Sequence, residues 1–183
     1  GDGTRGVGAD MALLAMVSYS IVHRRGPERF CAEAAEAGFD GLIVPDLPLE
    51  EAASFEPLAA SAGLCNVMLI SPTTPDERRL EIARHSRGFI YCISVAGITG
   101  ERTSLPEATI RGVAELRKHT DTPVCVGFGI SGPEMVRTVC EVADGAIVGS
   151  AIVHRITDGA DLPREKLVSE VGGFVEELLR PLL

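Results

Sequence analysis

Tryptophan is absent from this 183-residue sequence, and aromatic residues make up only 4% of it. Side chains that stack on nucleobases or fill flat protein interfaces are therefore scarce, which disfavours single-stranded nucleic acid as a ligand. Basic residues are also a minority, because 17 Lys and Arg stand against 26 Asp and Glu, for a net charge of −9. A surface of this charge repels phosphate backbones and anionic lipid headgroups, so nucleic acids and membrane surfaces are poor partners.

Long hydrophobic runs and targeting signals are also missing. No apolar stretch approaches the roughly 20 residues that cross a bilayer, and the first residues lack the basic start and apolar core of a signal peptide. We therefore expect a cytoplasmic protein. The five cysteines are odd in number, lack C-x-x-C spacing and mostly lie in apolar runs, which predicts buried, reduced thiols and no metal site.

The apolar residues, 45% of the chain, gather in six short runs that alternate with segments of helical periodicity. Each run is continuously apolar, so its strand is expected to be covered on both faces, as in a parallel sheet with crossover helices. The sequence therefore predicts an α/β fold in a single domain, residues 1–183. The runs span 11–17, 41–44, 65–70, 89–94, 124–128 and 145–148.

Proline and glycine indicate where the intervening helices begin and end. Pro27 suits the first turn of a helix that ends before Gly38, where glycine suits the carboxyl-terminal cap. Thr74 is expected to cap a further helix. His23 and His154 are expected in loops that follow strands, without a nucleophile pattern beside them.

The number of units leaves two architectures open. Six βα units occupy roughly 150 residues, whereas a complete eight-unit barrel takes about 250. The chain is therefore either an open, six-stranded, doubly wound sheet or a (β/α)8 TIM barrel of which it covers about the last six units.

Glycines follow the fifth and sixth runs, where each strand is expected to pass into a helix. Gly127 and Gly129 lie in the segment VGFGISGP, and Gly149 and Ser150 lie in IVGSAIV. Glycine lets the backbone approach a ligand closely, and the amides of a helix start carry positive partial charge. Two such junctions in the last two units predict a phosphate cradle made of backbone amides.

Earlier runs are followed by a glycine-rich loop and by an acidic residue. The segment SVAGITGERTS, which contains Thr99 and Gly100, has the length and composition of a lid. Tyr91, in the strand before it, is either a pocket residue or a packed core aromatic. Asp46 follows the second run and is either an acid, base or orienting group, or the cap of a helix that starts near Leu49.

Four segments, GFDGLIVPDLPLEE, SVAGITGER, VGFGISGPE and IVGSAIV, occur in an order and spacing that resemble the tryptophan synthase alpha subunit, from about Met11 to the end of the chain. The resemblance implies a (β/α)8 barrel that cleaves indole-3-glycerol phosphate by a retro-aldol reaction into indole and glyceraldehyde 3-phosphate, in tryptophan biosynthesis. It also implies a lyase with no cofactor of its own, whose indole passes to a PLP-dependent beta subunit in an alpha2beta2 assembly.

The resemblance also implies roles for single residues. Asp46 matches an aspartate associated with signalling toward the beta subunit. The family's acid/base glutamate and indole-binding aspartate would precede residue 1, so that 1–10 is a loop remnant and 11–183 holds units three to eight. Asp46 is then the remaining catalytic candidate, and the chain alone is expected to be inactive or nearly so. The implied phosphate residues are Gly100, Gly129, Gly149 and Ser150, and those of the indole pocket and lid are Ile43, Tyr91, Thr99 and Phe128.

Some residues depart from the family pattern, which more often has a tyrosine and an asparagine where this chain has Ser18 and Ser20. Two alternatives to this lyase stay open at this point. One is a non-catalytic module that binds a phosphate ligand or the beta subunit, and the other is another phosphate-handling TIM-barrel enzyme. Binding of simple sugar phosphates without binding of indole analogues would favour the second alternative.

Overall fold

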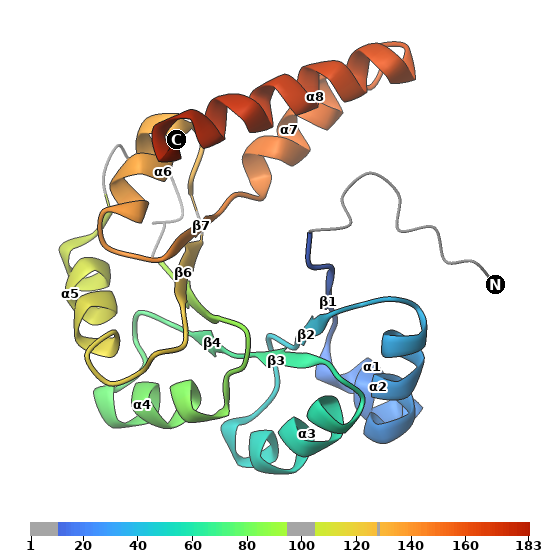
Figure 1. The fold of residues 1–183 in the computed structure, drawn as a ribbon, viewed down its shortest axis with the longest axis vertical. Helices are drawn as coiled ribbons and strands as arrows, with labels where there is room; N and C mark the ends of the chain where they lie inside the picture. Colours follow the sequence, from blue (N-terminus) through green and yellow to red (C-terminus); the bar gives the residue numbers. More distant parts are fainter. Residues whose placement is uncertain (1–10, 95–104, 128) are drawn as a thin grey trace. The chain divides into compact units, whose positions relative to one another are not determined.

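Each of the six apolar runs forms a strand in the computed structural model, which describes residues 11–94, 105–127 and 129–183 (Figure 1). The third run forms two short strands, one on either side of Met68. The strands are β1 (Leu14–Met16), β2 (Gly41–Ile43), β3 (Cys65–Val67), β4 (Leu69–Ile70), β5 (Ile90–Ile93), β6 (Val124–Gly127) and β7 (Gly145–Ile147).

Helices alternate with the strands, as the periodicity predicts. Pro27 is the first residue of its helix, and Gly38, with φ of 89°, lies just after the cap residue at its end. The helices are α1 (Tyr19–Arg25), α2 (Pro27–Glu36), α3 (Leu49–Ser61), α4 (Asp76–His85), α5 (Glu107–Leu116), α6 (Pro133–Cys140), α7 (Ser150–Asp158) and α8 (Arg164–Leu179), followed by the 3-10 turn η1 (Arg180–Leu182).

Three local predictions are wrong. His23 lies in α1 and His154 lies in α7, so neither histidine is in a loop after a strand. Thr74 does not cap α4, because Pro75 takes the cap position and the Thr74 hydroxyl instead accepts a hydrogen bond from Ser71 N–H at 3.1 Å. The hydroxyl is therefore used within the turn before the helix.

The strands form two parallel sheets, in the orders β1-β2-β3 and β4-β5-β6-β7. In the first sheet Leu42 of β2 is paired with Ala15 on one side and Asn66 on the other. In the second, Gly127 of β6 is paired with Ile147 of β7. Parallel strands joined through helices are the α/β arrangement that the continuous apolar runs predict.

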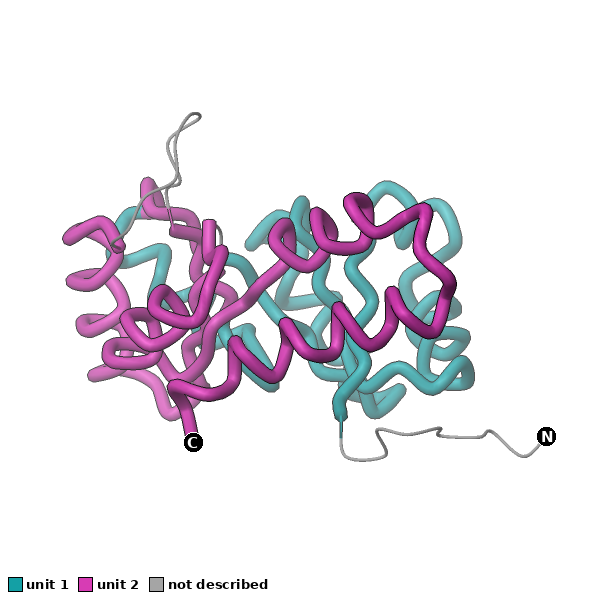
Figure 2. The backbone as a smooth tube through the Cα atoms, turned by 90° about the horizontal axis from the view of Figure 1, so that it is seen from above, with its two compact units in different colours: residues 1–69, 75–90 teal, residues 70–74, 91–183 magenta. Residues whose placement is uncertain are grey.

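The chain divides into two compact units, drawn in different colours in Figure 2. Unit 1 comprises residues 1–69 and 75–90, and unit 2 comprises residues 70–74 and 91–183. Each has its own set of fully or almost fully buried apolar side chains. Those of unit 1 include Val22, Leu42, Phe55, Val67 and Ile90, and those of unit 2 include Val113, Leu116, Val124, Val126 and Val139.

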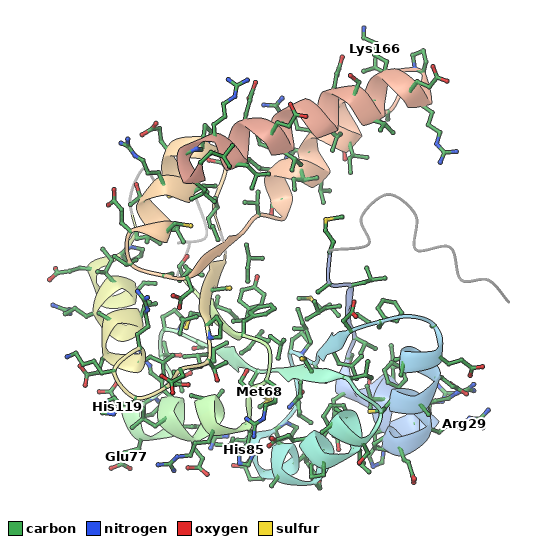
Figure 3. The ribbon with its side chains drawn as sticks, viewed as in Figure 1. Arg29, Met68, Glu77, His85, His119 and Lys166 are labelled. Atoms are coloured by element: carbon green, nitrogen blue, oxygen red, sulfur yellow. The ribbon has the colours of Figure 1, made fainter. Side chains whose placement is uncertain are left out.

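Helices α3 and α4 of unit 1 are joined by a partly buried ion cluster. Glu56 of α3 accepts from His85 Nδ1 at 2.9 Å and pairs with Arg87 Nη2 at 2.5 Å. His85, labelled in Figure 3, is the last residue of α4. This histidine is therefore engaged in helix packing.

The cysteines are free, and Cys31 and Cys92 are buried. Burial raises the pKa of the Cys31 thiol, and burial together with the charge of Asp144 raises that of Cys125 to about 11. Such thiols are protonated and weakly nucleophilic at neutral pH. None of the described helices is long and apolar enough to cross a membrane.

Candidate functional site

Asp46 follows β2, at the carboxyl end of the first sheet. Its side chain is exposed, yet both carboxylate oxygens accept hydrogen bonds from the loop after β1. Ser18 Oγ donates to Oδ2 at 2.7 Å, and Tyr19 N–H donates to Oδ1 at 2.6 Å. These bonds, that of Ser18 foremost, hold the pKa of the Asp46 carboxyl below its ordinary value. Asp46 is therefore ionised at neutral pH. An ionised carboxylate can accept hydrogen bonds from a donor but cannot act as a general acid.

Asp46 caps a helix, but not the helix expected from the sequence. Helix α3 begins at Leu49 as predicted, with Pro48 in the cap position. Helix α1 begins at Tyr19 and has no acidic residue in its first turn. Asp46 supplies that carboxylate from a separate loop, by accepting the Tyr19 N–H.

Ile43 ends β2 and is only 9% exposed. Its carbonyl accepts a hydrogen bond from Val17 N–H at 3.0 Å, which extends the pairing of β1 with β2 by one residue. Ile43 therefore has a buried apolar side chain at the carboxyl end of β2, three residues before Asp46.

Tyr91 of β5 packs against Gly127 of β6 in unit 2. A Cβ atom added to Gly127 would lie 2.5 Å from Tyr91 Cε2 and 2.6 Å from the hydroxyl oxygen. Its sequence context predicts that Gly127 lets the backbone approach a ligand, but the Tyr91 side chain fills the space where a Cβ of residue 127 would lie. Burial raises the pKa of the Tyr91 hydroxyl, which is therefore neutral at physiological pH.

Gly129 and Gly149 lie at equivalent positions of neighbouring strands. Gly127 of β6 is paired with Ile147 of β7, and each of the two glycines comes two residues after a member of that pair. Because the strands are parallel, both glycines lie at the same edge of the sheet. Both are exposed, and Gly129 has φ of 76°, a backbone conformation that favours glycine.

The helix that follows Gly149 has an uncompensated amino terminus. Helix α7 begins at Ser150 with Gly149 in the cap position, no side-chain cap bond and no acidic residue in its first turn. Every other described helix of eight or more residues has an acidic residue there. The first internal bonds of α7 run from Ile152 and Val153 N–H to the Gly149 carbonyl. The preceding amides and the helix dipole are therefore suited to an anion.

Three of the residues singled out in the sequence, Thr99, Gly100 and Phe128, lie outside the described residues. Of the others, the structure brings Gly129 together with Gly149 and Ser150 at one sheet edge of unit 2. Sequence reasoning missed Ser18 as a partner of Asp46. Ser18 departs from the family pattern, which marked the position as unusual. Its partner could not be predicted, because the contact joins residues 28 positions apart in the sequence.

A cavity of about 530 Å³ lies elsewhere in unit 2, between β7 and the helices α6, α7 and α8. Its lining is almost entirely apolar, and its carboxylate, Asp144, pairs with Arg117 at 2.8 Å. This chemistry does not suit a phosphate ester, so the cavity is not the phosphate site. Across the described ranges no three His, Cys, Asp or Glu side chains gather as metal ligands would.

Comparisons with known proteins agree on one family. A family model described as tryptophan synthase alpha chain matches residues 4–178. A curated relative of that name from Rhodopirellula baltica is 44% identical over 176 residues, which is 92% of this chain and 63% of the relative. Another, from Prochlorococcus marinus, is 53% identical over 155 residues, which is 84% of this chain and 55% of the relative. The chain thus spans less than two thirds of the length of either relative.

A solved structure of a mutant tryptophan synthase alpha-subunit from the hyperthermophile Pyrococcus furiosus is also similar. The two are 33% identical in sequence, with a TM-score of 0.80, over 93% of this chain and 67% of the other.

Proposed function

Because the chain belongs to the tryptophan synthase alpha chain family, we propose that it acts in tryptophan biosynthesis, in the lyase that cleaves indole-3-glycerol phosphate into indole and glyceraldehyde 3-phosphate. Its α/β fold is part of a (β/α)8 TIM barrel and not an open doubly wound sheet. The observation that carries the proposal is the amino terminus of α7, which comes two residues after the end of β7 and has no acidic residue in its own first turn.

The phosphate of the substrate lies, in this proposal, on backbone amides at the edge of the second sheet. Gly149 and Ser150 supply the start of α7, and Gly129 supplies the neighbouring turn. Helix α6, after Gly129, carries Glu134 in its first turn, so α7 is the more favourable of the two helix starts for a dianion. The resemblance to the family implies that Gly100 belongs to the same cradle.

The indole lies against apolar side chains. The resemblance to the family implies that Tyr91 and Ile43 both belong to this group. Within its own unit each side chain is buried, and the Tyr91 ring packs against Gly127. Thr99 and Phe128 complete this group in the proposal, as lid and pocket residues. The retro-aldol reaction needs proton transfers to and from the substrate, which carboxyl groups provide, so the proposed chemistry uses no cofactor in this chain.

The protein partner, in the same proposal, is a PLP-dependent beta subunit in an alpha2beta2 assembly. Asp46 contributes to that contact, because it is exposed and keeps its charge at neutral pH. Its ionised state argues against a role as the general acid of the cleavage.

Charge reversal at the phosphate cradle tests the proposal. Gly149→Asp and Gly129→Asp each place a carboxylate where the dianion is expected, and should abolish binding of glycerol 3-phosphate in isothermal titration calorimetry. Gly172→Asp on α8, a site with open space around it, is the control with the same change of charge and should bind as the unmodified chain does. Unchanged affinity in both cradle variants contradicts the phosphate assignment.

Ligand preference then distinguishes the lyase from another phosphate-handling barrel. An indole alkyl phosphate should bind more tightly than glycerol 3-phosphate, because its ring buries additional apolar surface on binding. Equal affinity for the two compounds would argue for a simple sugar phosphate as the substrate.

A further inference from the structure

The Asp46 carboxylate is held at both oxygens, although it is exposed to solvent. Ser18 Oγ lies 2.7 Å from Oδ2 and Tyr19 N lies 2.6 Å from Oδ1. An exposed aspartate without such bonds samples several rotamers in water. The two donors are adjacent in the chain, so together they fix the carboxylate in one orientation.

The hydroxyl bonds form a chain with a defined direction. Ser18 and Ser20 Oγ atoms lie 3.0 Å apart, and either could donate. An ionised carboxylate only accepts, so the Ser18 hydrogen is directed to Asp46, and Ser20 must donate to Ser18. Hydrogen bonds in such a chain polarise one another, which strengthens the bond from Ser18 to Asp46.

Other contacts attach the same loop to its neighbours. Val17 N–H donates to the Ile43 carbonyl at 3.0 Å, which anchors the loop to β2. The Tyr19 hydroxyl donates to Glu51 of α3 at 3.3 Å, and its ring lies edge-on to His23 at 5.9 Å. Among the described residues, the charged or titratable groups that contact this loop include Asp46, Glu51 and His23. The residues on either side of Ser18, Val17 and Tyr19, both donate backbone hydrogen bonds to the segment that contains Ile43 and Asp46. Ser18 can therefore hold Asp46 in a fixed position.

We propose that Ser18 is a positioning residue, which aims the unused lone pairs of the Asp46 carboxylate outward at a hydrogen-bond donor or cation on the partner surface. Each carboxylate oxygen keeps acceptor capacity after its bond to Ser18 or Tyr19, and the side chain is exposed. The inference rests on the proposed function of Asp46 as a partner contact. It assigns a role to a residue where the chain departs from its family's pattern.

The first test measures the Asp46 carboxyl itself. Titration of the chain, followed by the carbon-13 signal of the Asp46 carboxyl group, should show a higher pKa in Ser18→Ala, because the donor that lowers it most is gone. Ser18→Thr keeps a hydroxyl and should restore the low pKa. Ser20→Ala removes only the second bond of the chain and should give a smaller rise. An unchanged pKa in Ser18→Ala, or a threonine variant that behaves like the alanine variant, overturns the inference.

The second test measures binding to a tryptophan synthase beta subunit. Ser18→Ala should weaken binding about three- to tenfold, as loss of a hydrogen bond to a charged group does at an exposed site. In an Asp46→Asn background the same substitution should cause no further loss, because both act on one contact. Additive losses in the double variant would overturn the inference.

The two proposals fail in different ways. If Asp46→Asn leaves beta-subunit binding unchanged, Asp46 is not a partner contact, and both the proposed partner role and the inference are wrong. If Asp46→Asn weakens binding but Ser18→Ala changes neither the pKa nor the affinity, the partner role stands and the inference alone is overturned.

Discussion

A side chain at position 127 would occupy space that the Tyr91 ring already fills. The added Cβ would lie 2.5 to 2.9 Å from two ring carbons and the hydroxyl oxygen of Tyr91, closer than such atoms pack. We therefore predict that Gly127→Ala destabilises the chain by about 1 to 3 kcal/mol, the usual cost of overpacking a filled interior. Urea unfolding, followed by circular dichroism, measures the change.

Two further variants separate steric conflict from the general effect of replacing glycine. Gly172→Ala adds the same methyl group in open space inside α8 and should leave stability unchanged or raise it, because alanine favours a helix more than glycine does. Tyr91→Leu removes the opposing ring, so its combination with Gly127→Ala should cost less than the two single changes added together. Strict additivity would mean that the two residues do not compete for space.

Candidate residues were predictable from the sequence where their role depends on position along a strand. Asp46, Gly129, Gly149 and Ser150 all follow apolar runs, and the structure places each at the carboxyl end of its strand. Partners across the fold were not predictable in this way. The contact between Tyr91 and Gly127 arises because β5 lies beside β6 in the sheet. The local sequence around either residue does not indicate this neighbour.

Helices α1 and α2 are joined by a clamp of two arginines on one carboxylate. Arg25 donates to both oxygens of Glu33, at 2.8 and 2.7 Å, and Arg29 Nε donates to Oε1 at 2.9 Å. The hydrogen bonds from Arg25 and then Arg29 lower the pKa of Glu33 from 4.5 to about 2. Because the folded value is the lower one, the stabilisation is present above about pH 4.5 and is lost as the pH falls toward 2.

We therefore predict that Glu33→Gln removes part of the acid sensitivity of the chain. Thermal unfolding between pH 2 and pH 6 should show a smaller loss of Tm on acidification in Glu33→Gln than in the unmodified chain. Glu36→Gln, an exposed position on the same helix, is the matched control and should leave the slope unchanged. Equal slopes in all three proteins would show that the clamp does not contribute in solution.

At the level of elements, the sequence predicted every strand but not every break. The apolar run over 65–70 predicts one strand. The structure has two, β3 and β4, because Met68 N–H donates to Ser86 Oγ at 3.0 Å instead of to a neighbouring strand. Helix α1 was missed because it has seven residues and takes its acidic cap from Asp46, which lies 27 residues from Tyr19. In both cases a distant side chain overrides the local pattern.

At the level of the whole molecule, catalysis depends on which carboxylates reach the substrate. The family resemblance assigns the acid/base role to a glutamate that no residue of 11–183 matches, and Asp46 is ionised and bonded to Ser18 and Tyr19. We therefore predict that this chain by itself releases indole from indole-3-glycerol phosphate about 10²- to 10⁴-fold more slowly than a full-length relative, the contribution of one general acid/base group.

A colorimetric assay for indole, with the unmodified chain and with Asp46→Asn, provides the measurement. Addition of a separate polypeptide that carries the first two βα units of a relative should restore activity. Fast turnover by the unmodified chain that disappears in Asp46→Asn would instead make Asp46 the catalytic group.

The outer strands of the two sheets, among them β1 and β7, favour association between chains in solution. In the part of the molecule that the structure describes, β1 pairs along one side with β2, and β7 pairs along one side with β6. Exposed apolar side chains accompany each unit: Met11, Leu13 and Met16 at β1, and Val153, Ile156 and Val168 on α7 and α8, which lie side by side in Figure 1. Unpaired strand edges and exposed apolar surface both favour association between chains.

We therefore predict that the chain self-associates at micromolar concentration, which sedimentation velocity measures directly. Val168→Lys should shift the distribution toward monomer, because Val168 is 63% exposed on α8 and a lysine there opposes the burial of that face. Ser169→Lys introduces the same charge at the next position of the helix, which is also exposed, and should have less effect, since it removes no apolar surface. A single monomeric species of the unmodified chain, which also melts cooperatively, would contradict the prediction, because the exposed edges and apolar side chains would then be covered within one chain.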